Sequence, residues 1–178
     1  MVIMIGGSSH VGKTLLAQKL VKKLNYSCLS LDHLKMGLIR AGITNLTVEQ
    51  DYEMRYYLWP IVAEMIKTAI ENDQNLIIEG CYIPGEWQDS FTDEYLEKIR
   101  CIFIVMSEEY LREKFDDVKN YASVIEKRLD DNPDLERLIM CSKEFKKDCL
   151  EHGISCLEII KDYNPDKIIK LMLEMWGL

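Results

Sequence analysis

The nine residues "GGSSHVGKT", Gly6–Thr14, directly follow the apolar run "MVIMI". Residues 7–14 fit the pattern G-x-x-x-x-G-K-[ST], between a strand-like run and a helical pattern. The fixed positions of this pattern are Gly7, Gly12, Lys13 and Thr14. Glycines let main-chain N–H groups turn towards an anion, and the N-terminus of a following helix attracts the same charge. The stretch therefore predicts a phosphate-binding loop.

This loop offers both a cation and a metal ligand to a nucleoside triphosphate. Lys13 would bring a positive charge to the β- and γ-phosphates, and the Thr14 hydroxyl would ligate Mg²⁺. We expect ATP to contact the whole loop, which consists of Gly7, Ser8, Ser9, His10, Val11, Gly12, Lys13 and Thr14. The alternative is an ordinary strand-to-helix turn with a surface lysine, and the agreement of the fixed positions with both flanks disfavours it.

Length and composition indicate a single domain, residues 1–178, in which 48% of the residues are hydrophobic. The formal net charge of −8 argues against a general nucleic-acid-binding protein, although a few basic residues can still form a local pocket. No run approaches the roughly 20 apolar residues that span a membrane, and the opening run lacks the basic flank of a signal peptide. We expect a cytoplasmic protein without a membrane partner.

The six cysteines and three histidines form no zinc-binding pattern, and the sequence contains no CxxC pair. Cys28 and Cys101 lie in apolar, strand-like runs, and we expect both to be small buried hydrophobic residues. We therefore expect reduced thiols, as in a cytosolic protein.

Short apolar runs alternate with longer helical patterns along the chain. The predicted strands are Val2–Ile5, Tyr26–Leu31, Asn75–Glu79, Arg100–Met106 and Ile154–Ile159. The predicted helices are 13–24, 34–40, 48–72, 108–115, 133–151 and 165–176. Continuous apolar strands between helices indicate a parallel sheet covered on both faces. The fold class is therefore α/β, a three-layer α/β/α domain around a five-stranded parallel sheet.

The layout resembles the small P-loop kinases, the group that contains adenylate, shikimate and gluconate kinases. The resemblance covers nearly the whole chain, strongly at residues 7–14 and moderately elsewhere. It implies an acceptor-binding helical segment at 33–72 and an arginine-bearing lid at about 116–134. The sequence has no NKxD-type guanine motif, which argues against a GTPase.

The second predicted strand ends in "SLDHLKMGLIR", which places Asp32 at the carboxyl edge of the sheet. A carboxylate near the γ-phosphate can accept the proton of an attacking hydroxyl. The resemblance supports this role, because kinases of hydroxyl acceptors have an aspartate at the corresponding strand end. The alternative is that Asp32 only caps the following helix.

Two arginines are candidates for binding an anionic group of the acceptor. The resemblance assigns this role to Arg40, and Arg55 on the next predicted helix could join it. The guanidinium group suits forked recognition of carboxylate or phosphate. The alternative for each is a solvated charge on a helix surface.

The segment "LIIEGCYIP" places Glu79 and Gly80 at the end of the third predicted strand. Glu79 could hold the Mg²⁺ shell or orient a water, and Gly80 permits close approach of the substrate; the alternative for Glu79 is a loop carboxylate without a special role. The turn resembles the "DGFPR" turn of adenylate-type kinases, with Glu in place of Asp and no arginine. The missing arginine argues against a nucleoside monophosphate as acceptor.

Two further arginines follow from the resemblance. Arg112, in "SEEYLREKF", occupies the position of an arginine that stacks on adenine. The segment "KRLDDNPD" is similar to the R-x-D-D pattern of the adenylate-type lid, which makes Arg128 the lid arginine that reaches the transferring phosphoryl group. The alternative for Arg128 is a surface helix with paired charges. The turn "KDYNPD" resembles the segment that touches the adenine edge through backbone atoms.

Tyr52, Tyr56 and Trp59 share one face of the long predicted helix, where we expect core packing in preference to an acceptor pocket. Taken together, the residues and the resemblance favour a Mg²⁺- and ATP-dependent kinase of a small metabolite, with a hydroxyl as the acceptor. A nucleoside monophosphate kinase remains an alternative. A regulatory ATP-binding module without transfer chemistry is an alternative from another class.

Overall fold

The protein is described by a computed structural model that covers residues 1–121 and 133–178. Its five strands are β1 (Val2–Gly7), β2 (Ser27–Ser30), β3 (Leu76–Glu79), β4 (Ile99–Met106) and β5 (Cys156–Ile159). They form one sheet in the order β2-β3-β1-β4-β5, and every neighbouring pair is parallel. The predicted five-stranded parallel sheet is confirmed.

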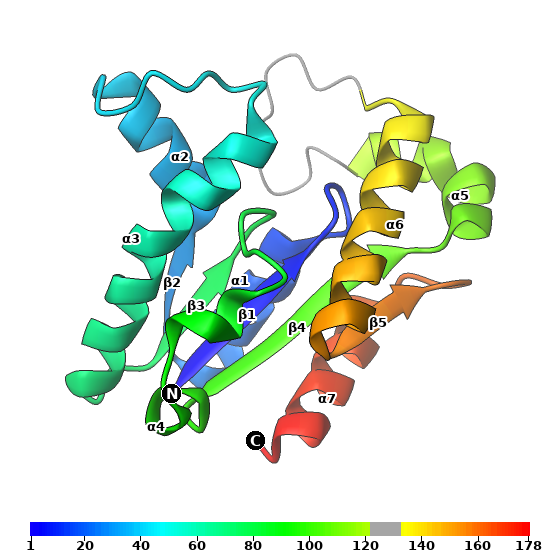
Figure 1. The fold of residues 1–178 in the computed structure, drawn as a ribbon. Helices are drawn as coiled ribbons and strands as arrows, with labels where there is room; N and C mark the ends of the chain where they lie inside the picture. Colours follow the sequence, from blue (N-terminus) through cyan, green and yellow to red (C-terminus); the bar gives the residue numbers. More distant parts are fainter. Residues whose placement is uncertain (122–132) are drawn as a thin grey trace.

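Helices cover both faces of this sheet (Figure 1). The longer ones are α1 (Lys13–Leu24), α2 (Leu31–Arg40), α3 (Asp51–Glu71), α5 (Glu108–Tyr121), α6 (Leu135–His152) and α7 (Pro165–Trp176). Two short elements between β3 and β4 were not predicted: the 3₁₀ helix η1 (Trp87–Ser90) and the one-turn helix α4 (Asp93–Leu96).

Alternation along β1 separates the two hydrophobic cores. Val2 and Met4 face a core that contains residues of α3 and α6, whereas Ile3 and Ile5 face a core that contains residues of α1, α5 and α7. All four side chains are fully buried. Successive side chains of a strand point to opposite faces, so a continuously apolar strand requires cover on both sides. The three-layer α/β/α arrangement follows from this burial and confirms the predicted fold class.

Within the described residues, no helix is long and apolar enough to cross a membrane. The helix predicted from residue 34 begins three residues earlier, with Ser30 at its N-cap. The helix predicted from residue 108 continues to Tyr121 through a non-helical conformation at Lys114. The predicted lid at 116–134 falls largely outside the described residues, and Arg128 lies outside them as well.

Candidate nucleotide and acceptor site

The phosphate-binding loop, residues 7–14, joins β1 to α1 and depends on glycine at two positions. Gly7 has φ 115°, and a Cβ there would clash with the main-chain carbonyl of Ile104 on β4. Gly12 has φ 79°, and a Cβ there would clash with the hydroxyl of Tyr163, which follows β5. The backbone conformation and the close contacts of the loop therefore require glycine at both positions.

The N-terminus of α1 has no side-chain cap, like those of α2 and α3 and unlike those of α6 and α7. Asp134 caps α6 by accepting a hydrogen bond from the Arg137 N–H at 2.8 Å, and Asn164 caps α7 by accepting one from the Lys167 N–H at 3.0 Å. At α1 the N-cap is Gly12, and no side chain caps the helix. The first N–H groups of α1 thus have no side-chain acceptor, which is compatible with the predicted binding of an anion.

Lys13 is buried, with 6% of its surface exposed, and its ammonium group lies across the loop. Its Nζ donates to the Ser8 carbonyl at 2.6 Å and to the Cys81 Sγ at 3.1 Å. Burial acts to lower the pKa of Lys13, but Cys81, Glu79 and Asp32 together raise it above its ordinary value. Lys13 therefore carries its positive charge inside the site.

Hydrogen bonds hold two other loop residues. The Ser8 hydroxyl accepts a hydrogen bond of 2.9 Å from Ser142 on α6, and Ser9 Oγ lies 2.8 Å from His10 Nδ1. Ser8 is fully buried. The loop is thus fixed to the neighbouring helix as well as to the sheet.

Thr14 and Glu79 form the candidate Mg²⁺ site. The Thr14 hydroxyl donates to Glu79 Oε2 at 3.2 Å, while Glu79 Oε1 is buried without a hydrogen-bond partner among the described residues. Burial raises the pKa of Glu79, with a smaller contribution from Asp32, although Ser30, Lys13 and Thr14 act to lower it. No group of three metal-ligating side chains occurs in the described part of the chain. A hydroxyl and a carboxylate oxygen nevertheless fit Mg²⁺, which usually keeps several waters and binds substrate phosphates.

Asp32 lies in the first turn of α2, and Ser30, not Asp32, is the N-cap of this helix. The reading of Asp32 as a simple cap is therefore wrong. Its carboxylate lines the same cavity as Lys13 and Glu79 and contributes to the pKa shifts of both. Next to Glu79, Gly80 has φ 154°, and a Cβ there would press against the side chain of Leu31. The backbone after β3 thus passes close to the start of α2.

One large cavity, of about 1690 Å³, joins these residues at the carboxyl edge of the sheet. Such an edge is the usual ligand site of an open α/β sheet. Around the phosphate-binding loop the cavity is lined by Tyr110, Lys114, Tyr163 and Pro165. Its opposite wall comes from α2, α3 and α6 and includes Lys35, Arg55, Tyr56 and Phe145.

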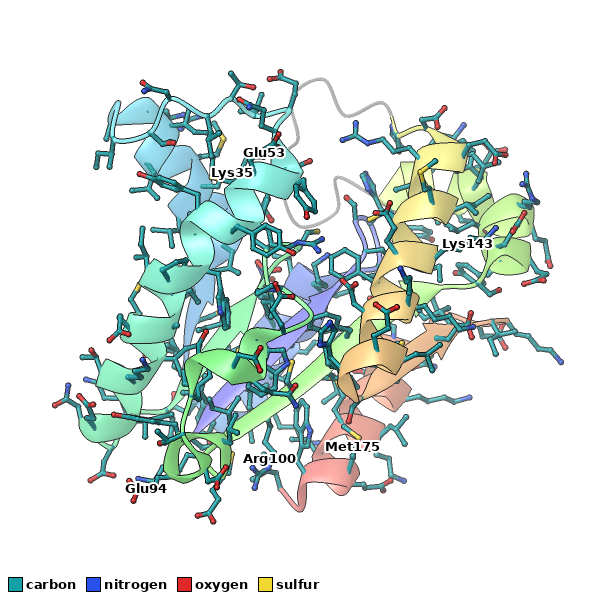
Figure 2. All side chains as sticks on the ribbon, in the orientation of Figure 1. Lys35, Glu53, Glu94, Arg100, Lys143 and Met175 are labelled. Carbon is teal, nitrogen blue, oxygen red and sulfur yellow. The ribbon has the colours of Figure 1, made fainter. Side chains whose placement is uncertain are left out.

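Lys35 is a buried cation of this opposite wall that the sequence analysis missed. Its Nζ donates to Val48 O at 2.8 Å, Asp51 Oδ1 at 2.7 Å and the Tyr82 hydroxyl at 2.8 Å. Tyr82 in turn donates to Asp51 Oδ1 at 2.8 Å. Figure 2 shows Lys35 on α2, beside the N-terminal part of α3 that carries Glu53. The three donors of Lys35 are all used, so this lysine ties α2, α3 and the segment after β3 together.

Arg55 lies in the cavity wall, as its predicted role requires. Its guanidinium group stacks over the Phe145 ring at 4.6 Å and lies 3.6 Å from Asp148 Oδ2. Its Nε is buried without a partner among the described residues. Burial raises the pKa of Asp148, while Arg55 acts to lower it. Arg55 thus keeps an unused donor next to the cavity, and its role as an acceptor ligand stays a prediction.

The aromatic residues of α3 divide between core and cavity. Trp59 is buried in the core, as expected. Tyr52 and Tyr56 are exposed over 69% and 42% of their surfaces, line the cavity, and have ring centroids 5.2 Å apart. The expectation of core packing is wrong for these two tyrosines, because α3 extends beyond the sheet edge at its N-terminal end.

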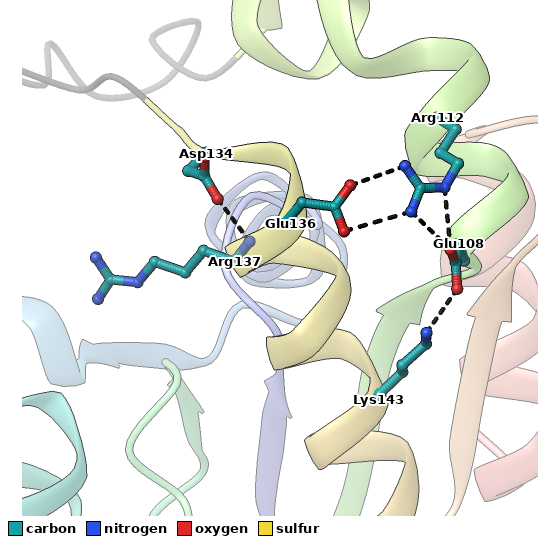
Figure 3. Close-up of polar contacts among 6 residues, drawn as sticks. All are labelled: Glu108, Arg112, Asp134, Glu136, Arg137 and Lys143. Atoms are coloured by element: carbon teal, nitrogen blue, oxygen red, sulfur yellow. Dashed lines mark hydrogen bonds and ion pairs between the residues drawn. The ribbon is translucent and has the colours of Figure 1, made fainter.

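Two predicted arginines do not line the cavity. Arg40 is exposed at the last turn of α2. Arg112 is exposed on α5 and binds Glu108 and Glu136, each with a shortest distance of 2.8 Å (Figure 3). Glu108 also binds Lys143 at 2.6 Å, so the Arg112 guanidinium joins a network between α5 and α6. Neither arginine lies in the cavity where Arg40 was predicted to bind the acceptor and Arg112 to stack on adenine.

Solved structures with the same architecture include small-molecule kinases. A sugar kinase from Janibacter sp. HTCC2649 matches with a TM-score of 0.61 and 15% identity over 99% of this chain and 94% of that chain. A gluconokinase from Sinorhizobium meliloti 1021 matches with a TM-score of 0.57 and 13% identity, over 99% of this chain and 91% of that chain. Shikimate kinase from Aquifex aeolicus matches with a TM-score of 0.51 and 19% identity, over 99% of this chain and 97% of that chain. The predicted likeness to the small P-loop kinases is confirmed at the level of the fold.

No protein-family model matches the sequence, and no curated protein matches it either. At these identities the solved structures show the fold alone, and the function has to be argued from the site.

Proposed function

We propose that this protein is a kinase that transfers the γ-phosphoryl group of ATP to a hydroxyl of a small metabolite. The observation that carries the proposal is the placement of Asp32 in one cavity with Lys13 and with the uncapped N-terminus of α1. A positioned base and a phosphate-binding loop are the two parts that transfer to a neutral hydroxyl needs. The fold shared with solved sugar, gluconate and shikimate kinases supports this reading.

In this mechanism the phosphate-binding loop holds the triphosphate through its main-chain N–H groups, and Lys13 neutralises the oxygens that gain charge during transfer. Bound Mg²⁺, held by Thr14 and Glu79, would supply further charge neutralisation. Asp32 accepts the proton of the acceptor hydroxyl as that oxygen attacks the γ-phosphorus. Arg55, whose side chain lines the cavity, orients the acceptor through a negatively charged group.

The test is an acceptor screen followed by one substitution. Purified protein with Mg²⁺ and ATP is assayed for ADP release with hydroxylated metabolites, including sugar acids, and with nucleoside monophosphates. Asp32→Asn should lower kcat on the hydroxyl acceptor about 10²-fold or more, while the affinity for a non-hydrolysable ATP analogue stays unchanged. Asp117→Asn, which removes another carboxylate of the cavity lining, is the matched control and should keep its activity.

The two alternatives give different outcomes in the same experiment. Rapid turnover of a nucleoside monophosphate that survives Asp32→Asn would establish a nucleoside monophosphate kinase. The exposed rings of Tyr52 and Tyr56 in the cavity wall favour that second candidate, because they could stack on a base. ATP binding without ADP release for any acceptor would instead indicate a regulatory module and end the enzyme proposal.

A further inference from the structure

A pair of cysteines lies outside the cavity, where α6 ends and β5 begins. Cys149 is buried on α6, and Cys156 is exposed as the first residue of β5. Residues 150–155 connect them and contain the turn at Gly153 that ends α6. All six cysteines lie in the described residues, as free thiols.

Strand register and helix periodicity bring these two thiols together. Cys156 is the partner of Phe103 across the β4–β5 pair, so both side chains lie on the same face of the sheet. The Phe103 ring packs against Phe145 of α6, with ring centroids 5.6 Å apart. Cys149 follows Phe145 by one helical turn and faces the same way. Cys149 and Cys156 accordingly lie on the face of the sheet that α6 covers, next to the Phe103–Phe145 contact.

The surroundings give the two thiols different characters. A hydrogen bond from Cys149 lowers the pKa of Cys156, and Lys146 acts in the same direction against the effects of burial and of Glu158. Lys146 itself binds Glu158 at 2.7 Å. The hydrogen bond and burial raise the pKa of Cys149, with Cys101 and Asp148 adding to the effect. Because Cys156 is exposed and Cys149 is buried, a soluble disulfide reaches Cys156 first, which is the arrangement of a nucleophile and a resolving cysteine.

We propose that Cys149 and Cys156 are a thiol–disulfide exchange site, with Cys156 as the thiol that reacts with small-molecule disulfides and Cys149 as the thiol that resolves the adduct. In the first step the Cys156 thiolate attacks one sulfur of glutathione disulfide, forming a mixed disulfide and releasing one glutathione thiolate, which takes up a proton. In the second step Cys149 loses its proton and attacks Cys156 Sγ, forming the Cys149–Cys156 bond and releasing the second glutathione. Two protein thiols are oxidised by two electrons, and one disulfide is reduced to two thiols.

Cys28 offers a matched comparison on the opposite side of the molecule. It lies in β2, the other edge strand of the sheet, and it is also exposed, so the expectation that Cys28 is buried is wrong. Burial of its thiol, with a smaller contribution from Glu79, raises the pKa of Cys28 to about 11. Exposure alone would make Cys28 and Cys156 equally reactive, whereas the proposal requires Cys156 to react first.

The experiment exposes the full chain to glutathione disulfide and follows intact mass and peptide maps over time. Wild-type protein should gain one glutathione at Cys156, then lose it and end with a Cys149–Cys156 disulfide and two fewer of its six free thiols. Cys149→Ser and Cys149→Ala should both stop at the Cys156 adduct, because no resolving thiol is present. Cys156→Ser should react at least about tenfold more slowly than Cys28→Ser at the same pH.

Several results would overturn the proposal. A stable glutathione adduct on wild-type Cys156, modification of Cys28 at an equal rate, or a disulfide between other cysteines would each do so. Should the Cys149 variants fail to fold, the wild-type time course still decides, because only a resolving thiol removes the adduct without added reductant. The outcome does not depend on kinase activity, so it stands or falls separately from the proposed function.

Discussion

The two walls of the cavity each contain a buried lysine, a carboxylate and a tyrosine, but they use them differently. On the nucleotide side, Glu79 Oε1 and the Tyr163 hydroxyl have no hydrogen-bond partner among the described residues, and Lys13 binds a carbonyl and a thiol. The corresponding groups on the opposite wall, formed by α2, α3 and α6, are Lys35, Asp51 and Tyr82, which bind one another at 2.7–2.8 Å.

The first set of residues has the features of a ligand-binding site, and the second has those of a network that holds structural elements together. A buried polar atom without a partner is costly, so a native protein retains it where a ligand, ion or water completes it. A fully bonded set of the same residue types fixes the elements that it joins. Lys13, Glu79 and Tyr163 should therefore matter for binding, and the bonded set of Lys35, Asp51 and Tyr82 for stability.

The largest expected effect is that of Lys13→Ala. Loss of the buried charge should weaken binding of Mg²⁺ and an ATP analogue at least about 10²-fold, because the Lys13 ammonium group lies within the phosphate-binding loop, bonded to the Ser8 carbonyl. Calorimetry measures the affinity, and circular dichroism should show an intact fold. An unchanged affinity for the ATP analogue would show that Lys13 does not bind the nucleotide, and would contradict the distinction between the two walls.

For Lys35→Met we expect a loss of stability without a matching loss of nucleotide affinity. The substitution removes three hydrogen bonds from a charged donor and should lower the free energy of unfolding by about 1.5–3 kcal/mol. Lys19→Met is the control: Lys19 makes a surface ion pair with Asp166 and should cost less than about 1 kcal/mol. Equal losses in urea unfolding for the two variants would contradict the structural role of Lys35.

Glu79 should make stability depend on pH. The folded state holds the Glu79 proton more tightly than the unfolded state, so the favourable contribution is present below the unfolded pKa of 4.5 and is lost as pH rises through the raised folded pKa. Glu79→Gln removes this dependence and should be about 1 kcal/mol more stable than wild type at pH 7, while binding Mg²⁺–nucleotide less tightly. Urea unfolding at several pH values measures the first effect; parallel pH profiles for the two proteins would refute it.

The smallest effects concern the two tyrosines. Tyr163→Phe removes a hydroxyl without a partner, whose pKa burial raises to about 12, and should leave the free energy of unfolding within about 0.5 kcal/mol of wild type. Tyr82→Phe breaks the bonds to Lys35 and Asp51 and should cost about 1 kcal/mol. Thermal unfolding of both variants side by side makes the comparison. A larger loss of unfolding free energy for Tyr163→Phe than for Tyr82→Phe would contradict the distinction between binding and structural residues.

The sequence analysis was most successful where the site is contiguous. Residues 7–14 form one turn between a strand and a helix, so their spacing carries most of their geometry. Glu79 could be placed for a similar reason, because parallel strands end at a common edge of the sheet. The alternation of apolar runs with helical patterns was likewise sufficient to predict the sheet and its two covered faces.

The acceptor wall was harder to predict because its members meet only in the folded chain. Arg40 was chosen for its chemistry, yet it is exposed on α2, whereas Lys35 of the same helix is buried. Lys35 follows Asp32 by three residues, so helical spacing could have placed both on one face. Its partners Asp51 and Tyr82 come from distant segments, and no local pattern announces them. Arg112 was assigned from a resemblance, and Glu136, 24 residues away, binds it instead.

The position of β1 at the centre of the sheet has a consequence for how the protein folds. Val2 pairs with Leu76 on one side and with Ile99 on the other, so neither edge of this strand can be satisfied by nearby residues. Such long-range pairing slows folding, because a large loop must close before any contact forms. During synthesis β1 therefore stays unpaired until β3 and β4 have been made. Because it is apolar, it is the segment that a chaperone would need to protect from aggregation.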